Sequence, residues 1–260
     1  MFNLENKKLV VIGGTSGIGF SAAKAFVQQG AKLVVVGKDD EYANEANKEL
    51  EPNVITLIAD VTHASTSMTA INTCVEKWGG FDGLYHIAGG SGRKWGDGPL
   101  HDLTLEGWNK TLQLNLTSLM LSNQAAVRSF LEQGSGGSIL NMGSVLAFSP
   151  SPEHFATHAY AAAKGAIIAF SKSIAAAYVK NDIRINVIAP GLIETPMAKR
   201  ASTDEKILSF IKNKQPLEGG RIGLPQDLLG IALYFMSDAS RFTTGQVVAV
   251  DGGWSISEGR

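Results

Sequence analysis

Short apolar runs alternate with longer amphipathic segments along almost the whole chain. Each run is of the kind that a parallel strand covered on both faces requires, and most end at glycine or a polar residue. The runs lie at 8–12, 33–36, 54–58, 81–87, 138–142, 183–188 and 246–250. Intervening segments such as 20–29 and 64–78 show helical spacing of apolar residues. We therefore expect one α/β domain over residues 1–260, with a single parallel sheet and helices on both of its faces.

The middle of this pattern contains one long helix and one irregular loop. A helix is expected at 105–133, and Asn115 lies inside it although asparagine is mildly unfavourable in helices. The stretch 91–99 is rich in glycine and polar residues and is the most loop-like part of the chain.

A glycine turn follows the first apolar run directly. Gly13-Gly14-Thr15-Ser16-Gly17-Ile18-Gly19 separates this expected strand from the helix at 20–29. In such a context, backbone N–H groups at the positive end of a helix bind a pyrophosphate, and the absent side chains let it come close. The spacing is Gly-x-x-x-Gly-x-Gly rather than Gly-x-Gly-x-x-Gly. A tight turn without a ligand is the alternative, and the flanking pattern favours a dinucleotide site.

The residues after the second and third strands bear on the cofactor. An acidic residue at the tip of the second strand would hold the ribose hydroxyls of NAD, whereas a basic one would accept the 2′-phosphate of NADP. Gly37 occupies that position and Lys38 follows, which favours NADP, although Asp39 and Asp40 offer a rival interpretation. After the third strand, Asp60 can accept a hydrogen bond from an adenine amino group, or it can be an acidic residue at a helix N-terminus.

The segment 144–164 carries the candidate chemistry. Three alanines separate Tyr160 from Lys164, and on a helix this four-residue offset places the two side by side. An ammonium favours a neighbouring phenolate, so we expect Lys164 to lower the pKa of Tyr160 from about 10 toward neutrality. Tyr160 can then exchange a proton with an alcohol or carbonyl. Ser144, at the end of the expected strand 138–142, can hydrogen-bond the same oxygen.

Composition and charge exclude several classes of protein. The apolar share of 44% and the charged share of 18% argue against disorder. A net charge of −1, without a basic stripe, argues against a nucleic-acid or membrane-surface partner. The single Cys74 permits no internal disulfide, residues 1–8 are polar, and no apolar run approaches the ~18 residues that span a bilayer. We expect a cytoplasmic protein with a small-molecule substrate and no metal site.

Taken together, these segments resemble the short-chain dehydrogenase/reductase family over essentially the whole chain. Each is a weak signal alone, but their order along the chain is a strong one. They are Gly13/Gly17/Gly19, Asp60, Ala88-Gly89, Asn115, Ser144, Tyr160/Lys164, Pro190-Gly191 with Thr195, and Thr244-Gly245-Gln246 to Asp251-Gly252-Gly253. The resemblance implies a single Rossmann domain, a seven-stranded sheet ordered 3-2-1-4-5-6-7, and a homotetramer.

The resemblance also implies roles for individual residues. It makes Tyr160 the proton donor or acceptor, and Lys164 the group that lowers its pKa and holds the nicotinamide ribose. It implies that Ser144 orients the substrate oxygen and that Asn115 positions a water linking Lys164 to solvent. From the glycine turn, the strand ends and the resemblance together, the expected cofactor-binding residues are Gly13, Thr15, Ser16, Gly17, Ile18, Gly19, Lys38, Asp60, Val61, Ala88, Gly89, Tyr160, Lys164, Pro190, Gly191, Ile193 and Thr195.

Some positions depart from the family pattern. Ile12 replaces a frequent threonine before the first glycine, and His86-Ile87 replaces two asparagines. Ser16 occupies a position that is often basic in NADP-preferring relatives, which weakens the argument from Lys38 and leaves NADP only ahead of NAD. The spacing from Ser144 to Tyr160 exceeds the usual one, and the extra length falls in the loop at 149–154.

The substrate site is expected over the carboxyl ends of the strands. Its walls would be the loop at 91–99, the loop at 149–158 and a lid at about 193–220. The candidate substrate residues are Arg93, Trp95, His154 and His158. The basic groups suit a polar or sugar-derived substrate with a carboxylate or many hydroxyls, whereas Trp95 equally suits an apolar or aromatic ketone.

The sequence therefore favours an NAD(P)-dependent oxidoreductase that transfers a hydride between nicotinamide and a carbonyl or secondary alcohol. A non-catalytic nucleotide-sensing relative is one alternative, which the complete set of candidate catalytic residues opposes. An epimerase or dehydratase that returns the nicotinamide unchanged is another, and the short stretch between Gly191 and the last strand opposes it.

Overall fold

The apolar runs form one parallel sheet in the computed structural model, which describes residues 2–259. The strands are β1 (Lys8–Ile12), β2 (Lys32–Gly37), β3 (Val54–Ile58), β4 (Gly83–His86), β5 (Gly137–Met142), β6 (Ile183–Pro190) and β7 (Val247–Val250). All neighbours pair in parallel, in the order β3-β2-β1-β4-β5-β6-β7. The fold inferred from the sequence is confirmed, including the strand order.

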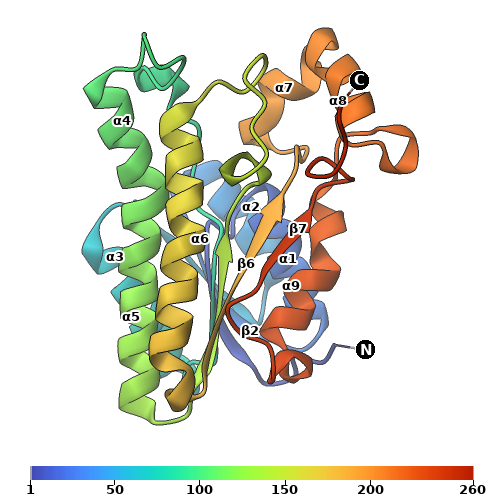
Figure 1. Cartoon of the computed structure of the whole chain (residues 1–260). Helices are drawn as coiled ribbons and strands as arrows, with labels where there is room; N and C mark the ends of the chain where they lie inside the picture. The colour runs from blue at the N-terminus through green and yellow to red at the C-terminus, as the bar shows by residue number, and fades with distance from the viewer. Residues whose placement is uncertain (1, 260) are drawn as a thin grey trace.

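Helices cover both faces of this sheet (Figure 1). They are α1 (Gly17–Gln28), α2 (Asp40–Leu50), α3 (Ala64–Trp78), α4 (Leu105–Leu112), α5 (Ser118–Gln133), α6 (His158–Tyr178), α7 (Lys199–Thr203), α8 (Glu205–Lys214) and α9 (Leu229–Met236). Successive strand residues point to opposite faces. Leu9 and Val11 therefore pack into the core beside α1, α2 and α9, while Val10 and Ile12 pack into the core beside α3, α5 and α6.

The expected helix at 105–133 is continuous in the structure but changes its hydrogen-bond pattern near its middle. A π-helical segment, Gln113–Thr117, lies between α4 and α5 and contains Asn115. Such segments insert one extra residue into a helical turn and are frequent at functional sites. The expected helical span 105–133 is therefore confirmed, with a π-helical turn at the residue that the sequence singled out as unfavourable.

Helix α6 is long and carries few charges. By length and composition alone, His158–Asn181 would qualify as a membrane span, and 28% of its most apolar window is buried. A core helix of a folded domain passes the same test. The helix packs on β6, and its buried residues include Ala163, Lys164, Ile167 and Ala175.

The carboxyl ends of the strands meet at one edge of the sheet. The loops after β4 and β5 and the segment carrying α7 and α8 lie beyond this edge, at the upper end of the molecule in Figure 1. Segments distant in the sequence are thereby brought together at the place where ligands bind in open α/β sheets.

Candidate active site

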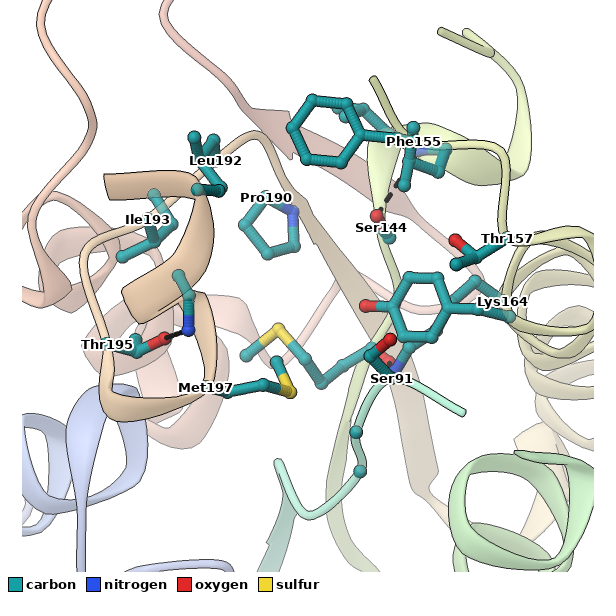
Figure 2. Close-up of a pocket in the computed structure, with 18 of the residues that line it drawn as sticks. Ser91, Ser144, Phe155, Thr157, Lys164, Pro190, Leu192, Ile193, Thr195 and Met197 are labelled. Atoms are coloured by element: carbon teal, nitrogen blue, oxygen red, sulfur yellow. Dashed lines mark hydrogen bonds between the residues drawn. The ribbon is translucent and has the colours of Figure 1, made fainter. Parts of the chain in front are cut away.

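A pocket of about 550 Å³ opens at this edge of the sheet. Ser144, Tyr160 and Lys164 all line it, so the structure brings the three candidate catalytic residues together. Figure 2 shows Ser144, Lys164 and Thr157 on one side of the cavity and Thr195 and Met197 on the other. The latter two belong to the segment expected to form a lid.

The Lys164 ammonium lies beneath Tyr160. Its Nζ is 5.4 Å from the centre of the Tyr160 ring and donates a 2.9 Å hydrogen bond to the Met142 carbonyl at the end of β5. The side chain is buried, and burial lowers the pKa of Lys164 to about 8. The two residues thus lie together on one face of α6, as the four-residue offset predicts.

The pKa of Tyr160 differs from the expectation. Burial raises the pKa of Tyr160 to about 12, and the Ser144 hydroxyl opposes this shift only in part. The expected lowering by Lys164 is absent: burial, which penalises the phenolate, dominates the shift, and the Lys164 ammonium donates its hydrogen bond to the Met142 carbonyl. Tyr160 is therefore a neutral phenol at neutral pH, which is the form that donates a proton.

Ser144 begins the turn that follows β5. Its Oγ accepts a 3.2 Å hydrogen bond from the Leu146 backbone N–H. Because this bond uses the oxygen as an acceptor, the hydroxyl proton remains available for an acceptor in the pocket.

Asn115 anchors the loop that follows β4. Its Oδ1 accepts from the Gly90 N–H at 3.1 Å, and its Nδ2 donates to the Gly90 and Thr111 carbonyls, each at 2.9 Å. A Cβ atom on Gly89 would lie 2.6 Å from this Oδ1, so only glycine allows the loop to come so close. The role of Asn115 in positioning a water stays a prediction.

His86, which replaces an asparagine of the family pattern, makes two hydrogen bonds of its own. The ring is fully buried, with Nε2 3.1 Å from the Ala88 carbonyl and Nδ1 2.7 Å from the Ser122 hydroxyl. Burial, with a smaller contribution from Lys164, lowers the pKa of His86 to about 3. The residue is thus a neutral hydrogen-bonding group that orients the end of β4.

Asp97 is a residue of the site that sequence reasoning missed. Its two carboxylate oxygens accept the backbone N–H groups of Ala159 and Tyr160, each at 3.0 Å, and the side chain is 3% exposed. Thr157, the N-cap residue of α6, makes no side-chain capping bond, so Asp97 takes over that function from a distant loop. No local signal could reveal this, because the partners are 62 and 63 positions apart.

A second pocket of about 490 Å³ adjoins the first and follows the glycine turn. Of the expected cofactor residues, it is lined by Gly13, Thr15, Ser16, Gly17, Ile18, Lys38, Asp60, Val61, Ala88, Gly89 and Thr195. Pro190, Gly191 and Ile193 line the first pocket instead. Gly19 lines neither pocket; a Cβ atom there would meet the Gly13 carbonyl oxygen, so its role is to let α1 pack on the glycine turn.

The glycine turn fits the pyrophosphate of a dinucleotide. Ser16, the N-cap residue of α1, makes no side-chain capping bond, and the first turn of α1 has no acidic residue. The N–H groups and the positive end of the helix are therefore left for an anion. Gly13 has a φ of 86°, and a Cβ atom there would lie 2.7 Å from the Ala88 nitrogen, so a side chain would disturb this turn.

The tip of β2 carries Gly37 and not the acidic residue that would bind the ribose hydroxyls of NAD. A Cβ atom on Gly37 would meet the Thr15 hydroxyl, which occupies that space. Lys38 Nζ lies 2.6 Å from Asp60 Oδ2, and this hydrogen bond, together with those from Thr62, holds the pKa of Asp60 well below its usual range. Asp39 accepts from the first N–H groups of α2, so it acts as an N-cap.

The expected substrate residues divide into two groups. Arg93 and Trp95 line the first pocket, whereas His154 and His158 do not. The ring of His154 packs 4.7 Å from that of Phe210, and His158 is exposed at the start of α6. The loop at 149–157 instead presents other side chains to the cavity.

Several pocket residues were not anticipated. They include Leu114, Leu146, Thr157, Met197, Arg200 and Trp254. Trp254, which follows β7, is 1% exposed. Its Nε1 donates to the Ser149 carbonyl at 3.1 Å, and its ring lies 5.6 Å from that of Phe155.

Comparison with known proteins agrees with this geometry. A family model described as enoyl-(acyl carrier protein) reductase matches residues 13–255. A 2,5-dichloro-2,5-cyclohexadiene-1,4-diol dehydrogenase of Sphingobium indicum is 32% identical over 97% of this chain and 98% of its own. An NADP-dependent (R)-specific alcohol dehydrogenase of Lentilactobacillus kefiri is 33% identical, with the same coverage.

Solved structures agree as well. A short-chain type dehydrogenase/reductase from Mycobacterium ulcerans superposes with a TM-score of 0.90 at 29% identity, covering 98% of this chain and 92% of that one. The chain therefore belongs to the short-chain dehydrogenase/reductase family and is an oxidoreductase acting on CH–OH or C=O groups.

Proposed function

We propose that the chain is an NADP-dependent reductase and dehydrogenase that interconverts a carbonyl compound and a secondary alcohol, with Tyr160 as its acid and base. The observation that carries the proposal is the meeting of Ser144, Tyr160 and Lys164 in one pocket that adjoins the glycine-turn pocket. The nicotinamide cofactor supplies or accepts the hydride.

The residues of the chain handle the substrate oxygen and its proton. In the reducing direction, Ser144 and Tyr160 donate hydrogen bonds to the carbonyl oxygen, and Tyr160 gives it a proton as negative charge develops there. The buried Lys164 ammonium, 5.4 Å from the ring centre, stabilises the phenolate that remains. In the oxidising direction Tyr160 must first lose its proton to solvent, and its phenolate then removes the proton of the alcohol while Ser144 holds the alcohol oxygen.

The absorbance of NADPH distinguishes this function from an epimerase or dehydratase. With a panel of ketones, oxo acids and keto sugars, the proposed enzyme consumes NADPH as alcohol forms. Product formation without net consumption of NADPH would contradict the proposal and support the alternative. Cofactor binding without any product would support a nucleotide sensor.

Lys38 is proposed to select NADP. Its side chain is 76% exposed at the wall of the glycine-turn pocket, where an ammonium can pair with a 2′-phosphate. We expect Lys38→Ala to lower kcat/KM with NADPH by about tenfold, the value of one charge-assisted contact, and to leave kcat/KM with NADH nearly unchanged.

The matched control is Lys48→Ala, which removes an exposed lysine of α2 that lines neither pocket. It should leave both cofactors unaffected. A parent enzyme that prefers NADH, with the same preference in Lys38→Ala, would remove the proposed role of Lys38.

We also propose a cytoplasmic homotetramer. Helix α6 exposes Ala162, Ala169 and Ala176 at seven-residue intervals, and such small side chains let a second helix approach closely. The one cysteine, Cys74, is free, in keeping with a reducing compartment. Sedimentation velocity at micromolar concentration tests the assembly, and a monomer would contradict it.

A further inference from the structure

All the charged side chains that line the first pocket, which contains Ser144 and Tyr160, are basic. Arg93, Lys94, Lys164 and Arg200 line it, and none of its lining residues is an aspartate or glutamate. Lys164 lies at the base and is hydrogen-bonded to the Met142 carbonyl. The other three belong to two segments, the turn after β4 and the start of α7. A pocket lined by one sign of charge concentrates ligands of the opposite sign.

Arg93 and Arg200 form the centre of this charge. Arg93 Nη2 donates to the His154 carbonyl at 3.3 Å, and Arg200 Nη2 donates to the same oxygen at 3.5 Å. Burial, and then repulsion from Arg200, lower the pKa of Arg93 from its ordinary value. Two guanidinium groups are therefore held together over one shared acceptor, although like charges repel.

No carboxylate within residues 2–259 forms an ion pair with either arginine. Asp97 attracts Arg93 electrostatically, but its two oxygens accept the N–H groups of Ala159 and Tyr160. Each guanidinium has five N–H donors, and one of them donates to the His154 carbonyl. The remaining donors are free to bind both oxygens of a carboxylate in parallel, which is the geometry that guanidinium groups favour.

Much of the remaining lining of this pocket is apolar. Leu146, Phe155, Met197 and Trp254 line the pocket, and none of them has a formal charge. These walls suit a hydrocarbon body better than the hydroxyl-rich body of a sugar acid, because each hydroxyl placed against them would lose its hydrogen bonds to water.

We infer that the substrate is an oxo acid, or the corresponding hydroxy acid, with an apolar body, whose carboxylate binds Arg93 and Arg200 while its oxo group meets Ser144 and Tyr160. This inference rests on the proposed function and adds the chemical class of the substrate.

Matched pairs of substrates test the inference. The probes are 3-oxobutanoate, 4-oxopentanoate, 5-oxohexanoate and 6-oxoheptanoate, each compared with its methyl ester, which has the same oxo group without the charge. We expect kcat/KM for the best acid to exceed that of its ester by about ten- to a hundredfold, the value of one charge-assisted contact. With NADPH saturating at every salt concentration, added salt should reduce kcat/KM for the acid and leave kcat/KM for the ester unchanged.

Three variants distinguish the effect of the Arg93 and Arg200 charges from general effects on the fold. Arg93→Gln and Arg200→Gln should each lower the ratio of acid to ester by about tenfold, mainly through KM for the acid. The matched control is Lys199→Gln, which removes a positive charge one residue away that does not line the pocket. It should leave the ratio as it is in the parent.

Binding provides a readout that does not depend on turnover. In calorimetry with NADPH present, hexanoate should bind at least about tenfold more tightly than the isosteric hexanamide, and Arg200→Gln should remove the difference. Equal binding and equal turnover of acids and neutral partners would overturn the inference and leave the oxidoreductase standing. Selective binding of hexanoate, with no turnover of any oxo compound, would support the anion site and overturn the proposed function.

Discussion

Replacing Tyr160 by phenylalanine is expected to lower kcat by about 10²–10⁴-fold, the usual contribution of a positioned proton donor. Phenylalanine keeps the ring over the Lys164 ammonium and removes only the hydroxyl, so the packing of α6 and the affinity for NADPH should change little. Single-turnover consumption of NADPH measures the chemical step, and fluorescence titration measures cofactor affinity.

A second tyrosine on the same helix is the matched control. Tyr178 ends α6, packs against the core beside α3 and α5, and lines neither pocket. Tyr178→Phe should retain the parent rate. If Tyr160→Phe reduces substrates as fast as the parent does, Tyr160 is not the proton donor.

Gly19→Ala is expected to abolish measurable NADPH binding. A Cβ atom at Gly19 would fall on the Gly13 carbonyl oxygen, 1.9 Å away, and both atoms are fixed by the backbone. The first turn of α1 would have to move away from β1, which would open the turn proposed to hold the pyrophosphate. Isothermal titration measures the affinity, and circular dichroism shows whether the helices remain.

The control substitution is Gly230→Ala, in helix α9. A Cβ atom there meets nothing within 4 Å. Because alanine favours helices by about 1 kcal/mol over glycine, this variant should be as stable as the parent or more so, with unchanged NADPH affinity. If Gly19→Ala binds NADPH as the parent does, the close approach of α1 to the turn is not required.

The sheet could be predicted because its signal is local. Each strand is a short apolar run, and alternation with helices permits few topologies for a parallel sheet. The π-helical segment at Asn115 could not be predicted, because one extra residue in a helix leaves no mark in its apolar spacing. The unfavourable asparagine was the only sign of it.

The site was predictable only where its residues are neighbours in sequence. Tyr160 and Lys164 are one turn apart on α6, so their juxtaposition follows from helix geometry. Asp97 and Arg200 reach the site through the folded topology, so no spacing could reveal them. The sequence predicted a lowered pKa for Tyr160, and the structure shows a raised one. The reason is related: the sequence reveals that Lys164 is near, but it does not reveal that Tyr160 is buried.

The turn that carries Arg93 also carries Asp97, which is hydrogen-bonded to the backbone of Tyr160. Grafting this turn from a relative to change what the enzyme accepts would therefore also disturb the group that protonates the product. Substrate range is better redesigned from the segment after β6, at Arg200, whose side chain lines the same pocket and makes no contact with the backbone support of α6.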